Sequence, residues 1–325
     1  MHILVATDRE LLVSDVERHS FTPADGIGDR PTCVVADPLV HGRAWCVTEN
    51  RGVFRSSDGG ESWQSVGLSG RLIMTVAASP AERNLVWVGT EPSAVWRSRD
   101  GGTTWEETSK LETLPSSRQW SFPPRPDTHH VRWIGCHPLD PERLWVAIEA
   151  GALVSTIDGG RSWRDRVPHG PWDTHELAIH QNAPDTLRVS AGDGYFESDD
   201  RGATWRSPSA GLEVSYMRSV AIGPEQPEVV VISGASGPRS AYVAGRSDGR
   251  VYRRVTGDRW ERVRDGWPEP ASTIAPLLCA GTKAGELWAA DERGVHRSDD
   301  GGMSWGNVVG YKAAPQHLRG LALVD

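Results

Sequence analysis

The sequence has few cysteines, no excess of positive charge and no long apolar run, and each absence excludes a class of protein. The four cysteines lack the CxxC spacing of a metal or redox site and lie in apolar contexts, so we expect buried thiols at Cys33, Cys46, Cys136 and Cys279. The formal net charge is −8, from 35 Lys and Arg against 43 Asp and Glu, which argues against nucleic acid or an anionic membrane as a partner. The chain begins directly as a strand without a basic segment, so we expect no export signal and a cytoplasmic location.

Phenylalanine is also scarce, with four residues, whereas the chain has 15 tryptophans. Six of these tryptophans end a repeated motif whose full form is Ser/Thr-x-Asp-x-Gly-x-Ser/Thr-Trp. Successive motif tryptophans lie 42 to 58 residues apart, so each motif marks one unit of a repeat array. Five good copies and a degenerate sixth span Ser56–Trp63, Ser98–Trp105, Thr156–Trp163, Ser198–Trp205, Ser298–Trp305 and Thr256–Trp260.

Each residue type in the motif favours a tight turn between two strands. The Asp and Ser/Thr side chains can accept hydrogen bonds from nearby backbone N–H groups. The glycines reach positive φ without steric cost. A short strand such as Ala94–Ser98 precedes every copy, so the motif predicts a β-hairpin.

This motif resembles the Asp box of the BNR-repeat proteins, which include sialidases and the Asp-box photosystem II assembly factors. The resemblance implies a β-propeller of glycosyl-hydrolase type. It says less about activity, because one fold hosts many functions.

The units predict an all-β chain folded as a seven-bladed β-propeller of four-stranded antiparallel blades. Each unit has an apolar strand, a turn, a second strand ending in an acid, and the hairpin that carries the motif. Strands from the two ends of the chain share one blade and close the ring, which removes an open sheet edge. We expect a single domain, residues 1–325, with blades at about 318–325 plus 1–21, 31–66, 72–109, 131–168, 175–209, 217–264 and 273–309.

Aligning the units places one position of each first strand around a common axis. Three arginines and a histidine share this position with Thr32, Met74 and, less clearly, Ala275; they are Arg132, His175, Arg218 and Arg319. Arginine suits the recognition of carboxylate or phosphate groups. The alternative is that these arginines only pair with neighbouring acids.

Acids end the second strands at the same rim, at Asp8, Glu49, Glu91, Glu149, Asp193 and Asp291. Crowding among acids raises some pKa values and nearby arginines lower others, so one pocket could hold both a general acid and a general base. For any one of these acids, the simpler explanation is a preference of the turn at the wall of a water-filled channel. The rim is the one opposite the motifs, where the long loops, above all 110–130, also lie.

Histidines and aromatics gather on this rim. His129, His130 and His175 could ligate a divalent metal together with Glu149, although no local metal-binding spacing is present, and no other cofactor is expected. Trp120, Trp172, Tyr195 and Tyr216 could contact the flat face of a sugar. Alternatively, Trp120 packs with Phe122 in a small core of the long loop.

These features favour a hydrolase or lyase that acts on a small anionic or carbohydrate-like substrate in a central pocket on the face opposite the motifs. The expected catalytic residues are Glu149, His175, Asp193 and Tyr216. The expected substrate-binding residues are His130, Arg132, Arg218, Arg319, Glu49, Glu91, Trp120, Trp172 and Tyr195.

Two alternatives remain. The first is a non-catalytic scaffold with a protein partner, as the resemblance to the assembly factors implies. The second is a sialidase-like exo-glycosidase, in which the three arginines grip a carboxylate and Tyr216 is the nucleophile. The absence of a Phe/Tyr-Arg-Ile-Pro motif, the seven predicted blades and the absence of an export signal count against it.

Overall fold

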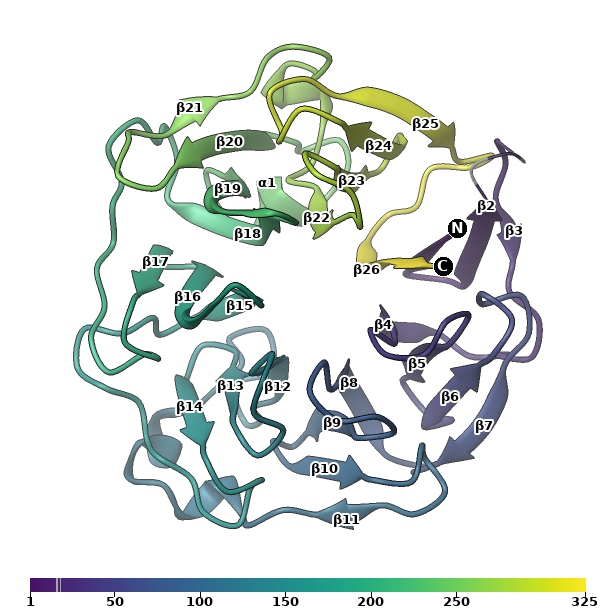
Figure 1. The fold of residues 1–325 in the computed structure, drawn as a ribbon, viewed down its shortest axis with the longest axis vertical. Coiled ribbons are helices and arrows are strands. Elements are labelled where there is room, and N and C mark those ends of the chain that lie inside the picture. Colours follow the sequence, from purple (N-terminus) through teal and green to yellow (C-terminus); the bar gives the residue numbers. More distant parts are fainter. Residues whose placement is uncertain (16, 18) are drawn as a thin grey trace.

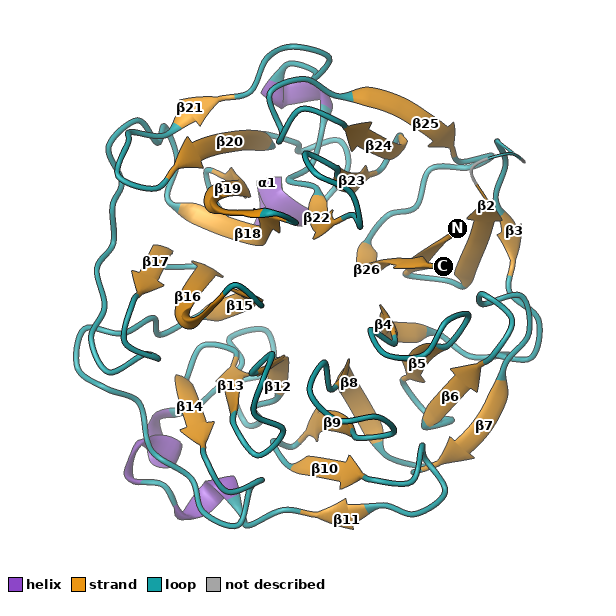
Figure 2. Cartoon of the chain, in the orientation of Figure 1, coloured by secondary structure: helices purple, strands orange, loops and turns teal. Residues whose placement is uncertain are grey.

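Seven small antiparallel sheets surround a central axis in the computed structural model, which describes residues 1–325 except 16 and 18 (Figure 1). The prediction of a seven-bladed β-propeller is confirmed. Residues 16 and 18 of the predicted terminal blade lie outside the described residues. Figure 2 shows how little of the chain is helical. Among the described residues, none of the helices is both long enough and apolar enough to cross a membrane.

The innermost strand of each sheet faces the axis. These strands are β4 (Pro31–Ala36), β8 (Leu72–Ala78), β12 (Val131–Cys136), β15 (Thr174–His180), β18 (Tyr216–Gly223), β22 (Leu277–Ala280) and β26 (Leu318–Val324). The second strands are β5 (Ala44–Thr48), β9 (Val86–Glu91), β13 (Leu144–Ile148), β16 (Ala183–Ala191), β19 (Gln226–Ala235), β23 (Leu287–Asp291) and β1 (His2–Thr7).

The outer half of each sheet is less regular. The third strands are β6 (Val53–Ser56), β10 (Val95–Ser98), β14 (Ala152–Thr156), β17 (Gly194–Ser198), β20 (Arg250–Val255), β24 (Gly294–Ser298) and β2 (Leu11–Asp15). Five sheets have a fourth strand: β7 (Gln64–Gly67), β11 (Glu106–Glu107), β21 (Glu261–Arg262), β25 (Gly306–Gly310) and β3 (Thr22–Pro23). In the other two, the predicted fourth strand is reduced to single bridges, Ser155–Arg164 and Glu197–Arg206.

Helical segments are confined to connections. A five-residue α1 (Pro238–Tyr242) lies between β19 and β20, and 3-10 turns cover η1 (Leu111–Thr113), η2 (Pro115–Gln119) and η3 (Pro270–Ser272).

The two ends of the chain share one sheet, with the order β26-β1-β2-β3. Strand β26 pairs antiparallel with β1 from His2–Val324 to Thr7–Leu318. Closure of the ring by terminal strands is therefore consistent with the expectation from the sequence.

The repeated motif forms the same hydrogen-bonded turn in each of its five good copies. In the first copy, Ser56 Oγ accepts from Gly60 N at 2.9 Å and donates to Asp58 Oδ1 at 2.7 Å. The other carboxylate oxygen of Asp58 accepts from Ser62 Oγ at 2.5 Å, and the Trp63 indole donates to Gly60 O at 2.8 Å. Equivalent bonds of the Ser/Thr and Asp side chains surround Asp100, Asp158, Asp200 and Asp300. The indoles of Trp205 and Trp305 also donate within their own turns, whereas Trp105 and Trp163 donate to Val66 O and Ser109 O of the preceding unit. The hydrogen-bonding groups of the Ser/Thr, Asp and Gly residues in each turn are thus satisfied within that turn.

Tryptophans and arginines hold neighbouring sheets together. The indoles of second-strand tryptophans are almost fully buried between the sheets, at Trp45, Trp87, Trp145 and Trp288. Third-strand arginines donate to a glycine carbonyl in the repeated turn of the next sheet, in the pairs Arg55–Gly101, Arg97–Gly159 and Arg253–Gly301, each at 2.8 Å. Because these contacts recur, the ring presents a rigid frame for the loops.

Antiparallel pairing fixes which loops share a face. The repeated turns and the turns between first and second strands lie at one end of the sheets. The turns between second and third strands and the connections between sheets lie at the other end, which we call the loop face.

Candidate functional site

A β-bulge marks the start of the innermost strand in six of the seven sheets of the described chain. At each bulge the pairing with the second strand skips one residue. The skipped residues are Thr32, Met74, Arg132, His175, Arg218 and Arg319, the same ones that the sequence alignment placed in one ring. Bulges re-aim a side chain and often lie beside functional sites.

All six bulge residues line one cavity of about 70 Å³ on the axis. Residues one to three positions further along the innermost strands complete its wall, among them Cys33, Glu176 and Leu278. The cavity therefore lies at the level where the innermost strands begin, below the loops of the loop face.

Glu149 follows β13 on the loop face, where its carboxylate lies close to Asp173 and His175. We call these three residues and the side chains that contact them the centre. The Oε2 atom of Glu149 is 2.8 Å from His130 Nε2 and 3.5 Å from Arg132 Nε. His130 is buried, and its Nδ1 lies 3.5 Å from Glu91. Burial raises the pKa of Glu149, but the hydrogen bond to His130 and the charge of Arg132 outweigh it and hold the pKa at about 2. Glu149 is therefore an ionised acceptor at neutral pH.

His175, one of the bulge residues, lies beside two tyrosines, with ring centres 4.9 Å from Tyr216 and 6.5 Å from Tyr242. Its Nδ1 lies 2.6 Å from Met217 O, and its Nε2 lies 3.2 Å from Tyr216 Oη and 3.6 Å from Asp173. Burial lowers the pKa of His175, but the neighbouring Tyr242 and Asp173 raise it to about 9. At neutral pH the imidazole is therefore a cation that donates from both nitrogens.

Tyr242 is the last residue of α1, and no feature of the repeat pattern predicted that it lies at the site. Two hydrogen bonds hold the end of this helix in place. Arg218 donates to Ala241 O at 3.2 Å, and Nδ1 of His317 lies 3.1 Å from Tyr242 O. The Arg218 guanidinium lies 4.5 Å from the centre of the Tyr242 ring. Burial raises the pKa of Tyr242, but the positive charges of His175, Arg132 and Arg218 outweigh it and lower the pKa below that of a free tyrosine.

The two tyrosines differ in their electrostatics although their rings are only 6.1 Å apart. Burial and the neighbouring Tyr242 raise the pKa of Tyr216. Tyr216 is thus a proton donor, and Tyr242 is the phenol that ionises more easily.

Other predicted site residues form ion pairs around this centre. Arg319 donates to Glu49 at 2.8 Å, and Arg30 lies 3.7 Å from the same carboxylate. Glu91 accepts from Arg125 of the long loop at 2.5 Å. The acids and arginines of the ring are therefore largely paired with one another, as the alternative in the sequence analysis allowed.

Asp193 lies beside the centre, where its carboxylate accepts from the backbone N–H groups of Trp172 and Asp173, each at 3.2 Å. It holds the loop that carries Asp173. Trp172 is 43% exposed on this loop. Gly192 makes room for the same loop, because a Cβ there would lie 2.1 Å from Asp173 Oδ2 and 3.2 Å from the Tyr216 ring.

Trp120 and Tyr195 are not brought to the centre. Trp120 is buried with the apolar residues of the long loop, and its indole donates to Ser116 Oγ at 3.0 Å. Tyr195 is buried in β17, where it packs edge-on against Trp260 and donates to Glu197. Both are packing residues in this fold.

The predicted histidine cluster does not assemble as a metal site. His129 Nδ1 lies 2.8 Å from Ser93 Oγ, whereas His130 binds Glu149. In the described chain, the metal-ligating atoms that lie within 4.8 Å of one another belong to Glu149, Asp173 and His175. Because His175 is protonated at neutral pH, a metal would have to displace its proton. The cluster is weak as a metal site, and nothing here identifies a cofactor.

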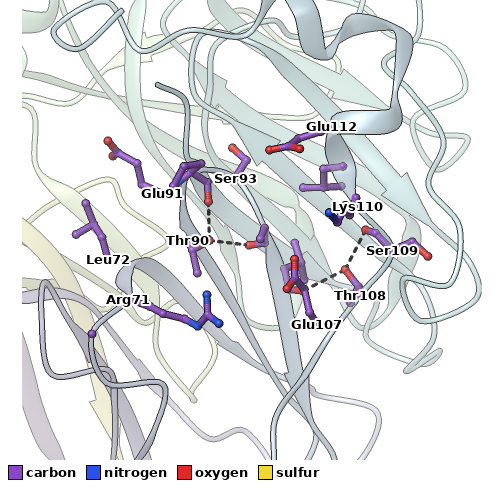
Figure 3. A pocket seen from close by; sticks show the side chains of 15 residues that line it. Arg71, Leu72, Thr90, Glu91, Ser93, Glu107, Thr108, Ser109, Lys110 and Glu112 are labelled. Atoms are coloured by element: carbon purple, nitrogen blue, oxygen red, sulfur yellow. Dashed lines mark hydrogen bonds between the residues drawn. The ribbon is translucent and has the colours of Figure 1, made fainter. Parts of the chain in front are cut away.

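A second hollow, the rim groove, lies outside the centre and has a volume of about 360 Å³. Figure 3 shows Arg71 on one side of this groove and Glu107, Thr108 and Lys110 on the other. The Arg71 guanidinium lies 4.2 Å from the Trp96 ring. Neither Arg71 nor Lys110 forms an ion pair among the described residues.

No family model matches the chain, and no curated protein matches its sequence. Solved structures do match its fold. A GH74 enzyme from Niastella koreensis has a TM-score of 0.74 at 14% identity over 95% of this chain and 52% of that one. The GH74 xyloglucanase from Xanthomonas campestris has a TM-score of 0.68 at 15% identity, over 99% and 52%.

The photosystem II assembly factor YCF48 from Cyanidioschyzon merolae also matches, with a TM-score of 0.61 at 16% identity over 90% of this chain and 94% of that one. The chain spans about half of the GH74 structures or less but nearly all of YCF48. At these identities the likeness shows the β-propeller fold alone. Its members include both glycoside hydrolases and a non-catalytic assembly factor.

Proposed function

We propose that the chain is a lyase or hydrolase that acts on a small anionic, carbohydrate-like substrate at the centre of the loop face, and that lyase chemistry fits this site best. The observation that carries the proposal is the arrangement of His175 against Tyr216 and Tyr242, beside Arg132 and Arg218. In this setting the pKa values of His175 and Tyr216 are raised and that of Tyr242 is lowered. We also propose that the repeated turns are Asp boxes. The four free thiols fit the reducing cytoplasm that we favour as its location.

Hydrolysis by a carboxylate pair needs one protonated carboxyl group as general acid. Glu149 cannot supply that proton near neutral pH, because its pKa is about 2. Asp173 faces the His175 cation as its acceptor. The sialidase-like alternative needs a tyrosine nucleophile supported by glutamate, but Tyr216 bonds to His175 and its pKa is raised. Elimination requires neither arrangement.

In the proposed elimination, Arg132 and Arg319 bind the carboxylate of the substrate, and Tyr242, as phenolate, removes the proton from the adjacent carbon. The electron pair of that C–H bond forms a C=C bond, and the bond from the next carbon to the leaving oxygen breaks with its electron pair. Tyr216 donates a proton to that oxygen, and His175 returns a proton to Tyr216. The partly exposed side chains of Arg132, Glu149 and Asp173 give the substrate access to these groups.

The test is a screen of uronate-containing oligosaccharides, read by the ultraviolet absorbance of the unsaturated carboxylate product. We expect turnover that Arg132→Met lowers about ten- to a hundredfold in kcat/KM, because a charge-assisted hydrogen bond contributes roughly 1.5–3 kcal/mol. The control is Arg83→Met, since Arg83 is exposed on the opposite face. New reducing ends without the absorbance change would assign hydrolysis instead, and no cleavage of any kind would overturn the enzyme proposal.

A non-catalytic scaffold is the second candidate, because the fold of YCF48, which has been solved bound to D1 peptide, matches nearly end to end, over 99% of this chain and 95% of that one. The rim groove is lined by Glu91, Glu107 and Glu112 as well as by Arg71 and Lys110, and these two cations, which form no ion pair in the described chain, are the groups that an acidic peptide segment would contact.

The scaffold candidate predicts that labelled acidic peptides bind with a Kd that rises at least tenfold in an Arg71→Ala/Lys110→Ala variant and stays unchanged in Arg83→Ala. Fluorescence anisotropy measures both values. Equal binding by all three proteins, or none by the unaltered chain, would reject the rim groove as a peptide site.

A further inference from the structure

Among the residues that the structure describes, Arg218 is a buried cation without a carboxylate partner. It is 2% exposed, and its two terminal nitrogens donate to backbone carbonyls of Ala241, Ala275 and Leu318. Its Nε is buried and has no hydrogen-bond partner among the described residues. Carbonyl dipoles and the ring of Tyr242 solvate the guanidinium, but no carboxylate neutralises it in the described chain, and a buried charge without compensation is costly. Only the ionised form of Tyr242 would offset this charge, and it would do so from the side of the loop face. Burial accordingly lowers the pKa of Arg218 to about 10.

The other three cations that line the axial cavity are compensated. Each has a carboxylate within 3.6 Å, in the pairs Arg132–Glu149, His175–Asp173 and Arg319–Glu49. Among the described residues that line the cavity, the one carboxylate is that of Glu176. It accepts hydrogen bonds from Ser219 Oγ and Val220 N, and burial raises its pKa to about 7. Glu176 therefore supplies only part of a negative charge at neutral pH.

We propose that the axial cavity binds one small monovalent inorganic anion, chloride in the cell, against Arg218 and Arg132. The Nε atom of Arg218 is buried and lacks a hydrogen-bond partner in the described chain, so one donor is free, whereas the Nε atom of Arg132 lies 3.5 Å from Glu149 and Arg132 contributes a second positive charge to the cavity wall. The cavity of about 70 Å³ has room for about two water molecules at roughly 30 Å³ each, or for one halide ion. It is too small for the sugar-like substrate proposed for the loop face above it.

An anion in the axial cavity would compensate the positive charge of Arg218. Arg218 also bonds to Ala241 at α1, to Ala275 before β22 and to Leu318 of β26. A counter-ion that fixes Arg218 therefore stabilises the junction of three sheets and the closing strand. The anion is expected to affect stability whether or not the loop face is an active site.

The test compares thermal unfolding of the full chain in sodium chloride, sodium bromide and sodium gluconate at equal ionic strength. We expect chloride and bromide, but not gluconate, to raise Tm saturably by about 5 °C at a hundredfold excess over Kd. Crystals soaked in bromide are expected to give an anomalous peak between Arg132 and Arg218.

Two variants separate binding from folding. Glu176→Gln keeps the shape of the cavity wall but removes its carboxylate, so we expect a Kd for bromide about tenfold lower than that of the unaltered chain. Arg218→Met removes the free donor and is expected to abolish the halide-dependent shift, with Arg83→Met as the control that retains it. Equal Tm values in halide and gluconate, or a cavity that contains only water after the bromide soak, would overturn the proposal.

Discussion

Tyr242→Phe is expected to lower kcat about 10²- to 10⁴-fold while KM and Tm change little. A decrease of this size is typical of an enzyme that has lost its general base. Phenylalanine keeps the ring that lies 4.5 Å from the Arg218 guanidinium, so the packing of α1 stays intact. What is lost is the oxygen, whose ionisation is favoured by His175, Arg132 and Arg218. The measurement is steady-state kinetics on the uronate substrate that the screen identifies.

The matched control is Tyr311→Phe, because Tyr311 is stacked on Phe21 away from the centre. It is expected to leave kcat unchanged. A Tyr242→Phe enzyme with full activity would exclude Tyr242 as the base. It would shift the role to a residue such as Glu149 and require a different proton path.

The rate is expected to depend on pH with two limbs. On the acidic side it falls as Tyr242 becomes protonated, at a pH below the pKa of an ordinary tyrosine. On the alkaline side it falls as pH rises through about 9, because His175 then loses the proton that it returns to Tyr216. Tyr216→Phe is expected to lower kcat and to remove the alkaline limb. A rate independent of pH across this range would contradict the relay.

The fold and the ring of the site could be predicted from the sequence because both rest on local repetition. The Ser/Thr, Asp and Gly groups of each good copy bond to one another within the turn, so each copy reports one sheet without knowledge of the others. Alignment of the units then placed Arg132, His175 and Arg218 at equivalent positions. The structure supplies the physical reason, which is a β-bulge that turns each of them toward the axis.

Residues outside the repeat could not be placed in this way. Tyr242 reaches the centre because Arg218 holds an insertion between β19 and β20, a contact that no periodicity encodes. Asp173 precedes its strand in a loop whose position depends on Asp193 and on the space left by Gly192. Trp120 and Tyr195 matched the aromatic composition of a sugar site, yet their side chains fill the core. Composition specified the chemistry of these residues but not the direction of their side chains.

A chain that ends at His317, without β26, is expected to lose its cooperative unfolding transition. Leu318 and Val324 are buried, and full burial contributes about 1.5–3 kcal/mol for each side chain, a large part of a typical stability of roughly 5–15 kcal/mol. The deletion also removes the backbone pairing with β1, the Leu318 carbonyl that binds Arg218, and the Arg319–Glu49 pair. Without β26, the edge of β1 would have no strand to pair with.

Circular dichroism during heating measures this effect, and deletion of Asp325 alone is the control. The control is expected to retain a sharp transition, because Asp325 is exposed and contributes one backbone hydrogen bond, to Gly42. If the longer deletion instead unfolded cooperatively within a few degrees of the full chain, the six complete sheets and the three remaining strands of the seventh would be stable without closure. The buried core around Ile3 and Val5 argues against that result, since both side chains lose their cover when β26 is removed.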